Sequence, residues 1–358
     1  MRIFIKYFIL TISIFIATYV TIGFSLSSPS YLGPVSEYYD GESFRNIYPP
    51  TKTDSIFKRL STNLQFKSSR NLTAVFPIKE SQFVSVTNNI KVTHINHSSW
   101  LLQYQDMTII IDPIFSDRAS PLQFIGPKRT HEPPFSLTDT PHIDIIFVSN
   151  NHYDKMDKTT LKYLISRDNP VCISGLGTHL LLNQWGCETV VGLNWFETLA
   201  FNEDFSFTFT PSHDSSGRGL LDKNNSLWGG LLIEYKKQHT TYYTGDVSNS
   251  ELFDFLTKQL SPIQLLILPQ LDTVSNHEIS SQLMTTSKAV LFHNQLNSQQ
   301  TLTPSLATFT PSNLSLSNIH EDLAVKKSIY NILDTSFLTM ISGQQIIHEI
   351  SSMKMIEN

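Results

Sequence analysis

The sequence predicts an α/β protein, because short apolar segments typical of strands alternate with amphipathic segments typical of helices. The apolar run Ile143–Val148 indicates a buried strand. Thr159–Ile165 indicates the helix after it, and Val171–Ser174 and Thr178–Trp185 repeat the order of strand and helix. This alternation is the main evidence for the fold class.

Similar patterns continue on both sides of this region. Strands are expected at 90–95, 100–104, 108–111, 190–191, 205–210, 231–235, 241–244 and 265–268, and a helix at 252–260. The pair 231–235 and 241–244 has the spacing of a hairpin. The polar residues 294–318, rich in Ser, Thr and Pro, predict a long surface loop.

Composition limits the classes of function. A chain of 358 residues can hold one large domain or two ordinary ones. Its net charge of −5 and the lack of a Lys/Arg run argue against a nucleic-acid partner. Cys172 and Cys187 are too few for a disulfide framework. We favour two buried free thiols, with a disulfide as the alternative if the protein is exported.

The N-terminus is the most apolar part of the chain. Arg2 and Lys6 precede an uncharged run, Tyr7–Phe24, and the next cationic residue is Arg45. This pattern predicts an uncleaved membrane anchor that leaves the bulk of the chain on the non-cytoplasmic side. A removed signal peptide is the alternative, since Ser25-Leu26-Ser27 has cleavage-like spacing. We therefore divide the chain into an anchor or signal peptide (1–25), an extension (26–80) that includes an amphipathic helix at 55–64, and a main domain (81–350).

Several local motifs carry a family resemblance. They are Ile95-Asn96-His97-Ser98-Ser99, Asp112-Pro113-Ile114-Phe115-Ser116-Asp117-Arg118-Ala119-Ser120-Pro121, and Gly245-Asp246. Together they resemble the metallo-β-lactamase superfamily, in its N-acyl-phosphatidylethanolamine-hydrolysing phospholipase D-like and L-ascorbate-6-phosphate lactonase-like branch. The resemblance implies a four-layer αβ/βα sandwich. It also implies descent from metal-dependent hydrolases of phosphodiester or lactone-like substrates, N-acyl phospholipids among them.

The segment Val148–Asp157 is similar to the His-x-His-x-Asp-His metal-binding loop of that superfamily. The four ligand positions of the loop hold Asn150, His152, Asp154 and Lys155. Carried over on the same resemblance, the remaining metal-site and substrate-side positions are Asp214, Asp246, Leu283 and Ser305, and the expected supporting residues are His97, Asp112 and His213. Zinc sites use imidazole, thiolate or carboxylate, whereas an ammonium group only donates hydrogen bonds.

Two kinds of site remain open. Lys155 could pair with Asp154 and Asp246 and replace the cation, which favours no metal cofactor and a pseudoenzyme that retains a pocket for a lipid or phosphodiester ligand. Alternatively His152, Asp154, Asp214 and Asp246 could hold one divalent cation (zinc, manganese or magnesium), with Asp154 and Asp246 as catalytic residues of an active hydrolase. A third hypothesis is an envelope interaction scaffold; the expected partner is the membrane, and the sequence does not determine the oligomeric state.

Overall fold

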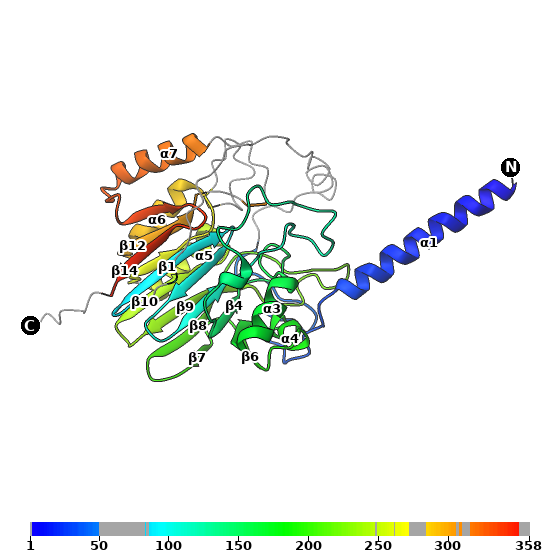
Figure 1. The fold of residues 1–358 in the computed structure, drawn as a ribbon, viewed down its shortest axis with the longest axis horizontal. Coiled ribbons are helices and arrows are strands. Elements are labelled where there is room, and N and C mark those ends of the chain that lie inside the picture. The colour runs from blue at the N-terminus through cyan, green and yellow to red at the C-terminus, as the bar shows by residue number, and fades with distance from the viewer. Residues whose placement is uncertain are drawn as a thin grey trace, which may run out of the picture.

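Two seven-stranded sheets form the centre of the protein. In the computed structural model they pack face to face, with helices on the outside (Figure 1). The structure describes residues 2–49, 83, 86–247, 249–260, 262–271, 284–305, 308–309 and 316–350. This two-sheet α/β architecture is the predicted one.

The first sheet has the order β14-β1-β2-β3-β4-β5-β6. Its strands are β1 (Asn89–Asn96), β2 (Ser99–Gln103), β3 (Thr108–Ile111), β4 (Ile145–Val148), β5 (Val171–Gly175), β6 (Thr189–Leu193) and β14 (Gln345–Glu349). Strands β3 to β6 are parallel, and β14 pairs with β1 in the antiparallel direction. All four residues of β4 are buried because layers cover both faces of the sheet.

The second sheet has the order β13-β12-β11-β10-β9-β8-β7. Its strands are β7 (Thr198–Ala200), β8 (Phe205–Pro211), β9 (Gly229–Tyr235), β10 (His239–Tyr243), β11 (Leu265–Ile267), β12 (Gln300–Pro304) and β13 (Phe337–Met340). β9 and β10 form the predicted hairpin.

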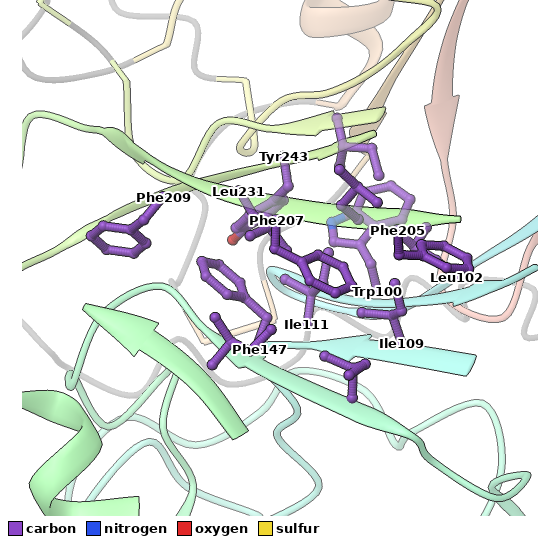
Figure 2. Close-up of a cluster of buried hydrophobic side chains, with 14 of the residues drawn as sticks. Trp100, Leu102, Ile109, Ile111, Phe147, Phe205, Phe207, Phe209, Leu231 and Tyr243 are labelled. Atoms are coloured by element: carbon purple, nitrogen blue, oxygen red, sulfur yellow. The ribbon is translucent and has the colours of Figure 1, made fainter. Parts of the chain in front are cut away.

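The main core lies between the two sheets. Figure 2 shows Phe147 and Ile111 of the first sheet opposite Phe207 and Tyr243 of the second. Alternating burial along β8 directs Phe205, Phe207 and Phe209 into this core. These aromatic side chains fix the separation of the sheets, and the loops at one end of the strands form the site described below.

Helices close the outer faces. α3 (Lys158–Asp168) and α4 (Thr178–Gln184) cover the first sheet, and α5 (Ser250–Leu260), α6 (Thr286–Gln295) and α7 (Leu316–Ile329) cover the second. One 3₁₀ turn, Leu137–Asp139, precedes β4. α3 begins at its N-cap Asp157, whose carboxylate accepts from the Thr159 amide, and ends at Asn169 in the left-handed conformation.

The prediction of a surface loop over 294–318 is wrong in two places. Residues Gln300–Pro304 form β12, an inner strand between β11 and β13, and α7 begins at Leu316. Thr301, Leu302 and Thr303 are fully buried. The high Ser and Thr content was misleading because Thr is also a favourable strand residue whose hydroxyl can be satisfied inside the protein, as Thr303 donates to the Pro269 carbonyl.

The N-terminal run forms α1 (Arg2–Leu26), which projects from the body of the molecule in Figure 1. None of the helices in the described part of the chain combines the length and the apolar character that crossing a membrane requires. The predicted membrane segment is therefore not supported. The predicted helix at 55–64 lies outside the described residues.

The two cysteines form a disulfide, which corrects our preference for free thiols. Cys172 of β5 and Cys187, after α4, are joined by an S–S bond of 2.14 Å. Both residues are buried. The prediction failed because spacing along the sequence does not show that a strand and a helix end will bring two Cα atoms within 6.6 Å.

Candidate functional site: a polar cluster centred on Lys155

The loop that follows β4 is anchored by a buried aspartate. Asp112, at the end of β3, accepts hydrogen bonds from the Ser149 amide (2.7 Å), the Ser149 hydroxyl (2.5 Å) and the Tyr243 hydroxyl (2.7 Å). Burial raises the pKa of Asp112 to about 6, and the positive charge of Lys155 opposes this rise. Asp112 thus ties the ends of β3, β4 and β10 together and fixes the start of the loop.

Lys155 lies at the centre of the loop and is 4% exposed. Its ammonium group donates to the Ser98 hydroxyl at 2.9 Å and forms an ion pair with Asp246 at 3.2 Å. Burial alone would lower the pKa of Lys155, but Asp246, Tyr243, Asp154 and Asp112 outweigh it and raise the pKa well above the usual value. The side chain is therefore a fixed positive charge inside the cluster.

Asp154 has a different partner. Its carboxylate lies 2.9 Å from His97 Nε2. Although burial raises the pKa of Asp154, the His97 hydrogen bond and the nearby charges of His97, Lys155 and His152 hold it well below its usual range. His97 is itself held in a left-handed conformation, with its amide donating to the Thr308 hydroxyl.

Asp214 is held from two sides. The Asn150 side chain donates to Asp214 Oδ2 at 2.6 Å, and His152 Nδ1 lies 4.0 Å from the same oxygen. Asn46, from the N-terminal extension, exchanges two hydrogen bonds with the Asp214 backbone. Burial raises the pKa of Asp214 to about 6, His152 lowers it, and Asp246 raises it further.

Asp246 reaches the cluster through a turn that requires glycine. Gly245 has φ +59°, and a Cβ atom there would lie 2.7 Å from the Gly229 carbonyl oxygen. The Asp246 side chain is 39% exposed, so one part of this carboxylate faces solvent. Its carbonyl accepts from the His213 amide at 2.9 Å.

Arg218 supports the loop from behind. Its guanidinium donates to the Asn151 and Met156 carbonyls at 2.7 and 2.9 Å and stacks on the Tyr153 ring at 4.0 Å. These two hydrogen bonds join Arg218 to the residues before and after Asp154 and Lys155. The arginine therefore holds the loop in its conformation.

The structure brings most of the predicted residues together. Asn150, His152, Asp154, Lys155, Asp214, Asp246, His97 and Asp112 belong to one network of contacts and charges. His213 contacts Asp246 through its backbone amide, and its side-chain Nε2 has no hydrogen-bond partner among the described residues. Ser305 is 5% exposed, and its hydroxyl has no hydrogen-bond partner among the described residues. Leu283 lies outside the described residues.

Sequence reasoning missed four residues of the network: Asn46, Ser98, Ser149 and Tyr243. Ser98 and Ser149 are next to residues that were singled out, so adjacency was an available signal. Asn46 had none, because it reaches the site from an extension with no recognisable motif.

The cluster does not fit the pair of metal ions that the resemblance to metal-dependent hydrolases implies. Each carboxylate already has a protein donor: His97 for Asp154, Asn150 for Asp214 and Lys155 for Asp246. An ammonium within 3.2 Å of Asp246 repels a second cation at that carboxylate. In the described part of the chain, no three His, Cys, Asp or Glu side chains are arranged to hold a metal ion.

Comparison with known proteins identifies relatives. The family described as "Beta-lactamase superfamily domain" matches residues 107–303. The chain is 36% identical over 159 residues to a mitochondrial N-acyl-phosphatidylethanolamine-hydrolyzing phospholipase D of Saccharomyces cerevisiae, covering 42% of this chain and 34% of the yeast protein. It is 30% identical over 191 residues to the enzyme N-acyl-phosphatidylethanolamine-hydrolyzing phospholipase D 1 of Caenorhabditis elegans, covering 49% and 52%. The chain thus spans a third to a half of the length of these relatives.

Solved structures show the same fold. An isothiocyanate hydrolase from Delia radicum gut bacteria superimposes with a TM-score of 0.57 at 14% identity, covering 73% of this chain and all of that one. A metallo hydrolase from Ignicoccus hospitalis gives a TM-score of 0.54 at 16% identity, covering 74% and 100%. At these identities the likeness extends to the fold alone.

Proposed function

The chain belongs to the β-lactamase superfamily, in the branch of N-acyl-phosphatidylethanolamine-hydrolysing phospholipase D homologues, and on this premise we propose that it is a pseudoenzyme in which a lysine replaces the catalytic metal. The observation that carries the proposal is the ion pair between Lys155 and Asp246, at 3.2 Å. Asp246 matches the bridging aspartate of the family, so an internal ammonium neutralises the carboxylate that would otherwise hold two ions. The superfamily uses such ions to lower the pKa of bound water and to polarise the scissile bond. We infer that this protein has lost efficient metal-dependent hydrolysis.

The solvent-accessible part of the polar cluster supports a binding role. Asp154, Asp246 and His152 each keep about a third of their side-chain surface accessible, at 34%, 39% and 32%. The relatives named above hydrolyse N-acyl phosphatidylethanolamine, according to their names. The ligand class we propose is therefore a lipid or another phosphodiester.

Metal analysis tests this proposal. Protein equilibrated with excess zinc, manganese or magnesium and then desalted should contain substoichiometric metal. The variant carrying Asn150→His, Lys155→His, Asp214→His and Ser305→His should bind zinc, because imidazole replaces an amide, an ammonium, a carboxylate and a hydroxyl at the family's ligand positions. A full equivalent of metal in the unaltered protein, lost in Asp154→Ala and Asp246→Ala, would overturn the proposal.

One observation favours a second candidate, an active hydrolase with a rearranged site. His152 and Asp214 lie 4.0 Å apart and both reach solvent, at 32% and 23% exposure, beside the exposed part of Asp246. Carboxylate oxygens suit magnesium or manganese better than a zinc pair, and these side chains would have to move closer together to hold an ion. Hydrolysis of N-acyl phosphatidylethanolamine or a chromogenic phosphodiester with added manganese, abolished by Asp214→Asn, would establish this candidate and exclude the first.

We also propose that the bulk of the protein lies outside the cytoplasm. The Cys172–Cys187 disulfide supports this location, because disulfides persist mainly in oxidising compartments. Fractionation of cells that express the chain with and without residues 1–25 tests it, together with alkylation of free thiols before lysis. Reduced cysteines and a cytosolic fraction in both cases would contradict the proposal, and release from the membrane on truncation would identify an anchor.

A further inference from the structure

Two histidines meet between the sheets at the end of the sandwich opposite the polar cluster. His239 begins β10, whose other end leads to Asp246, and His348 lies on β14. Their ring centroids are 5.0 Å apart. The residues are only 2% and 5% exposed, so this contact joins the edge strand of the first sheet to an inner strand of the second within the interior.

The hydrogen bonds of both rings are compatible with neutral imidazoles. His348 Nδ1 lies 2.8 Å from Gln300 Oε1, an acceptor, so this nitrogen carries the hydrogen. His348 Nε2 is buried and has no hydrogen-bond partner in the part of the chain described. His239 Nε2 lies 3.1 Å from the Thr241 hydroxyl, which accepts from Tyr104.

Among the described residues, no carboxylate acts on either ring to compensate for a positive charge. Burial lowers the pKa of His239 to about 3, with a contribution from His348, and burial lowers the pKa of His348 to about 4. The titratable groups on the adjoining strands β9, β1 and β14 are Tyr235, which pairs with His239, and His94, whose ring packs on Trp100. The others are Glu234, Lys91 and Glu349, which alternation directs to the outer faces of the sheets. None of these offers a carboxylate to either imidazole.

We infer that His239 and His348 form an acid-sensitive clasp, which holds β14 against the second sheet while both rings are neutral and releases it when they are protonated. β14 is an edge strand, and among the described residues its ladder is with β1. The His239–His348 contact and the His348–Gln300 hydrogen bond link β14 to the second sheet, and Ile346 adds apolar packing against the core between the sheets. We call β14 closed when it is held against the second sheet and open when it is released. An imidazole that stays neutral in the closed state but has a pKa near 6.5 in the open state favours opening at low pH. Below pH 6.5, the equilibrium constant for opening rises about tenfold for each pH unit. Two such groups give an increase of about 100-fold between pH 7.5 and pH 5.5.

Hydrogen exchange of the full chain, corrected for the intrinsic effect of pH, tests the clasp. Protection of the β1–β14 amides should fall about 100-fold more than that of the β8–β9 amides between pH 7.5 and pH 5.5. The double variant His239→Gln with His348→Gln should lose this extra fall, and His320→Gln, which removes an exposed histidine, should keep it. A parallel loss of protection in both ladders, or an extra fall retained in the double variant, overturns the inference.

A pH titration of the histidine resonances uses only the unaltered protein, so it does not depend on whether the variants fold. The imidazole C–H resonances of His239 and His348 in the unaltered protein should show no titration above pH 5, because their folded pKa values lie near 3 and 4. Titration of either ring near pH 6.5 in the folded protein would overturn the clasp.

Discussion

Replacing Lys155 by methionine removes the charge and keeps most of the side-chain volume. Lys155 is 4% exposed and interacts with Asp246, Asp154 and Asp112, so the variant leaves an acidic cluster without its internal cation. Removing one partner of a buried ion pair costs roughly 3–5 kcal/mol. Because the Asp246 side chain is 39% exposed and water can solvate it, we expect the lower end, about 3 kcal/mol.

Urea unfolding at pH 7.5, followed by tryptophan fluorescence with the disulfide intact, measures this loss. Asp246→Asn and the double variant complete a cycle, in which a coupling of about 1–3 kcal/mol is expected for groups in direct contact. The matched control is Lys236→Met, whose ion pair with Asp204 at 3.9 Å is on the surface and should leave the unfolding midpoint unchanged. A Lys155→Met protein as stable as the parent, or a cycle without coupling, would refute the compensating role of this ammonium.

Two further predictions concern stability. Asp214 has a pKa raised to about 6 in the folded state against 3.8 unfolded, so its ionisation destabilises the fold as pH rises through 6; Asp214→Asn should therefore gain about 1–3 kcal/mol relative to the parent between pH 4.5 and pH 7.5. A constant difference between the two urea midpoints across this range would contradict that assignment. The Cys172–Cys187 disulfide closes a segment with a sequence separation of 15, and the double serine variant should lose about 3 kcal/mol. Reduction of the parent should produce the same loss, and an unchanged midpoint in both experiments would show that the crosslink does not contribute.

Most strands and helices between residues 89 and 267 were predicted from the sequence, with β7 as the exception, because the local patterns there match the burial of each element. The strand Thr108–Ile111 has its predicted bounds, and the helix predicted at 159–165 extends only by a few residues to Lys158–Asp168. In these elements the spacing of the apolar residues matches the repeat of the strand or helix. The residues that the sequence pattern marks as buried are therefore the ones that the structure buries.

The C-terminal part was harder to predict for a physical reason. β12 is an inner strand of its sheet although only Leu302 among its five residues is a large apolar residue. Its threonines are buried because neighbouring strands and helices cover them, which a local pattern does not record.

The candidate site was predictable only as a set of positions. Motif spacing placed Asn150, Lys155 and Asp246 in one region, and the fold brings them together. Motif spacing could not show which side chains would pair. Lys155 was expected to form an ion pair with Asp154 as well as with Asp246, whereas His97 is the residue that contacts the Asp154 carboxylate. Pairing of this kind depends on side-chain distances that only the folded chain defines.

The contact between Asn46 and Asp214 has a practical consequence for dissecting this protein. A fragment that starts at residue 83, shortly before the recognisable motifs, would retain every strand of the described residues and still lose the two hydrogen bonds between Asn46 and the Asp214 backbone. Ser28, Phe44 and Asn46 all form hydrogen bonds with the segment 214–224. The shortest fragment that keeps these contacts therefore has to begin before residue 28. Recombinant versions trimmed to the recognisable motifs would lack these hydrogen bonds, so a loss of binding or activity in them would not show that the intact protein lacks it.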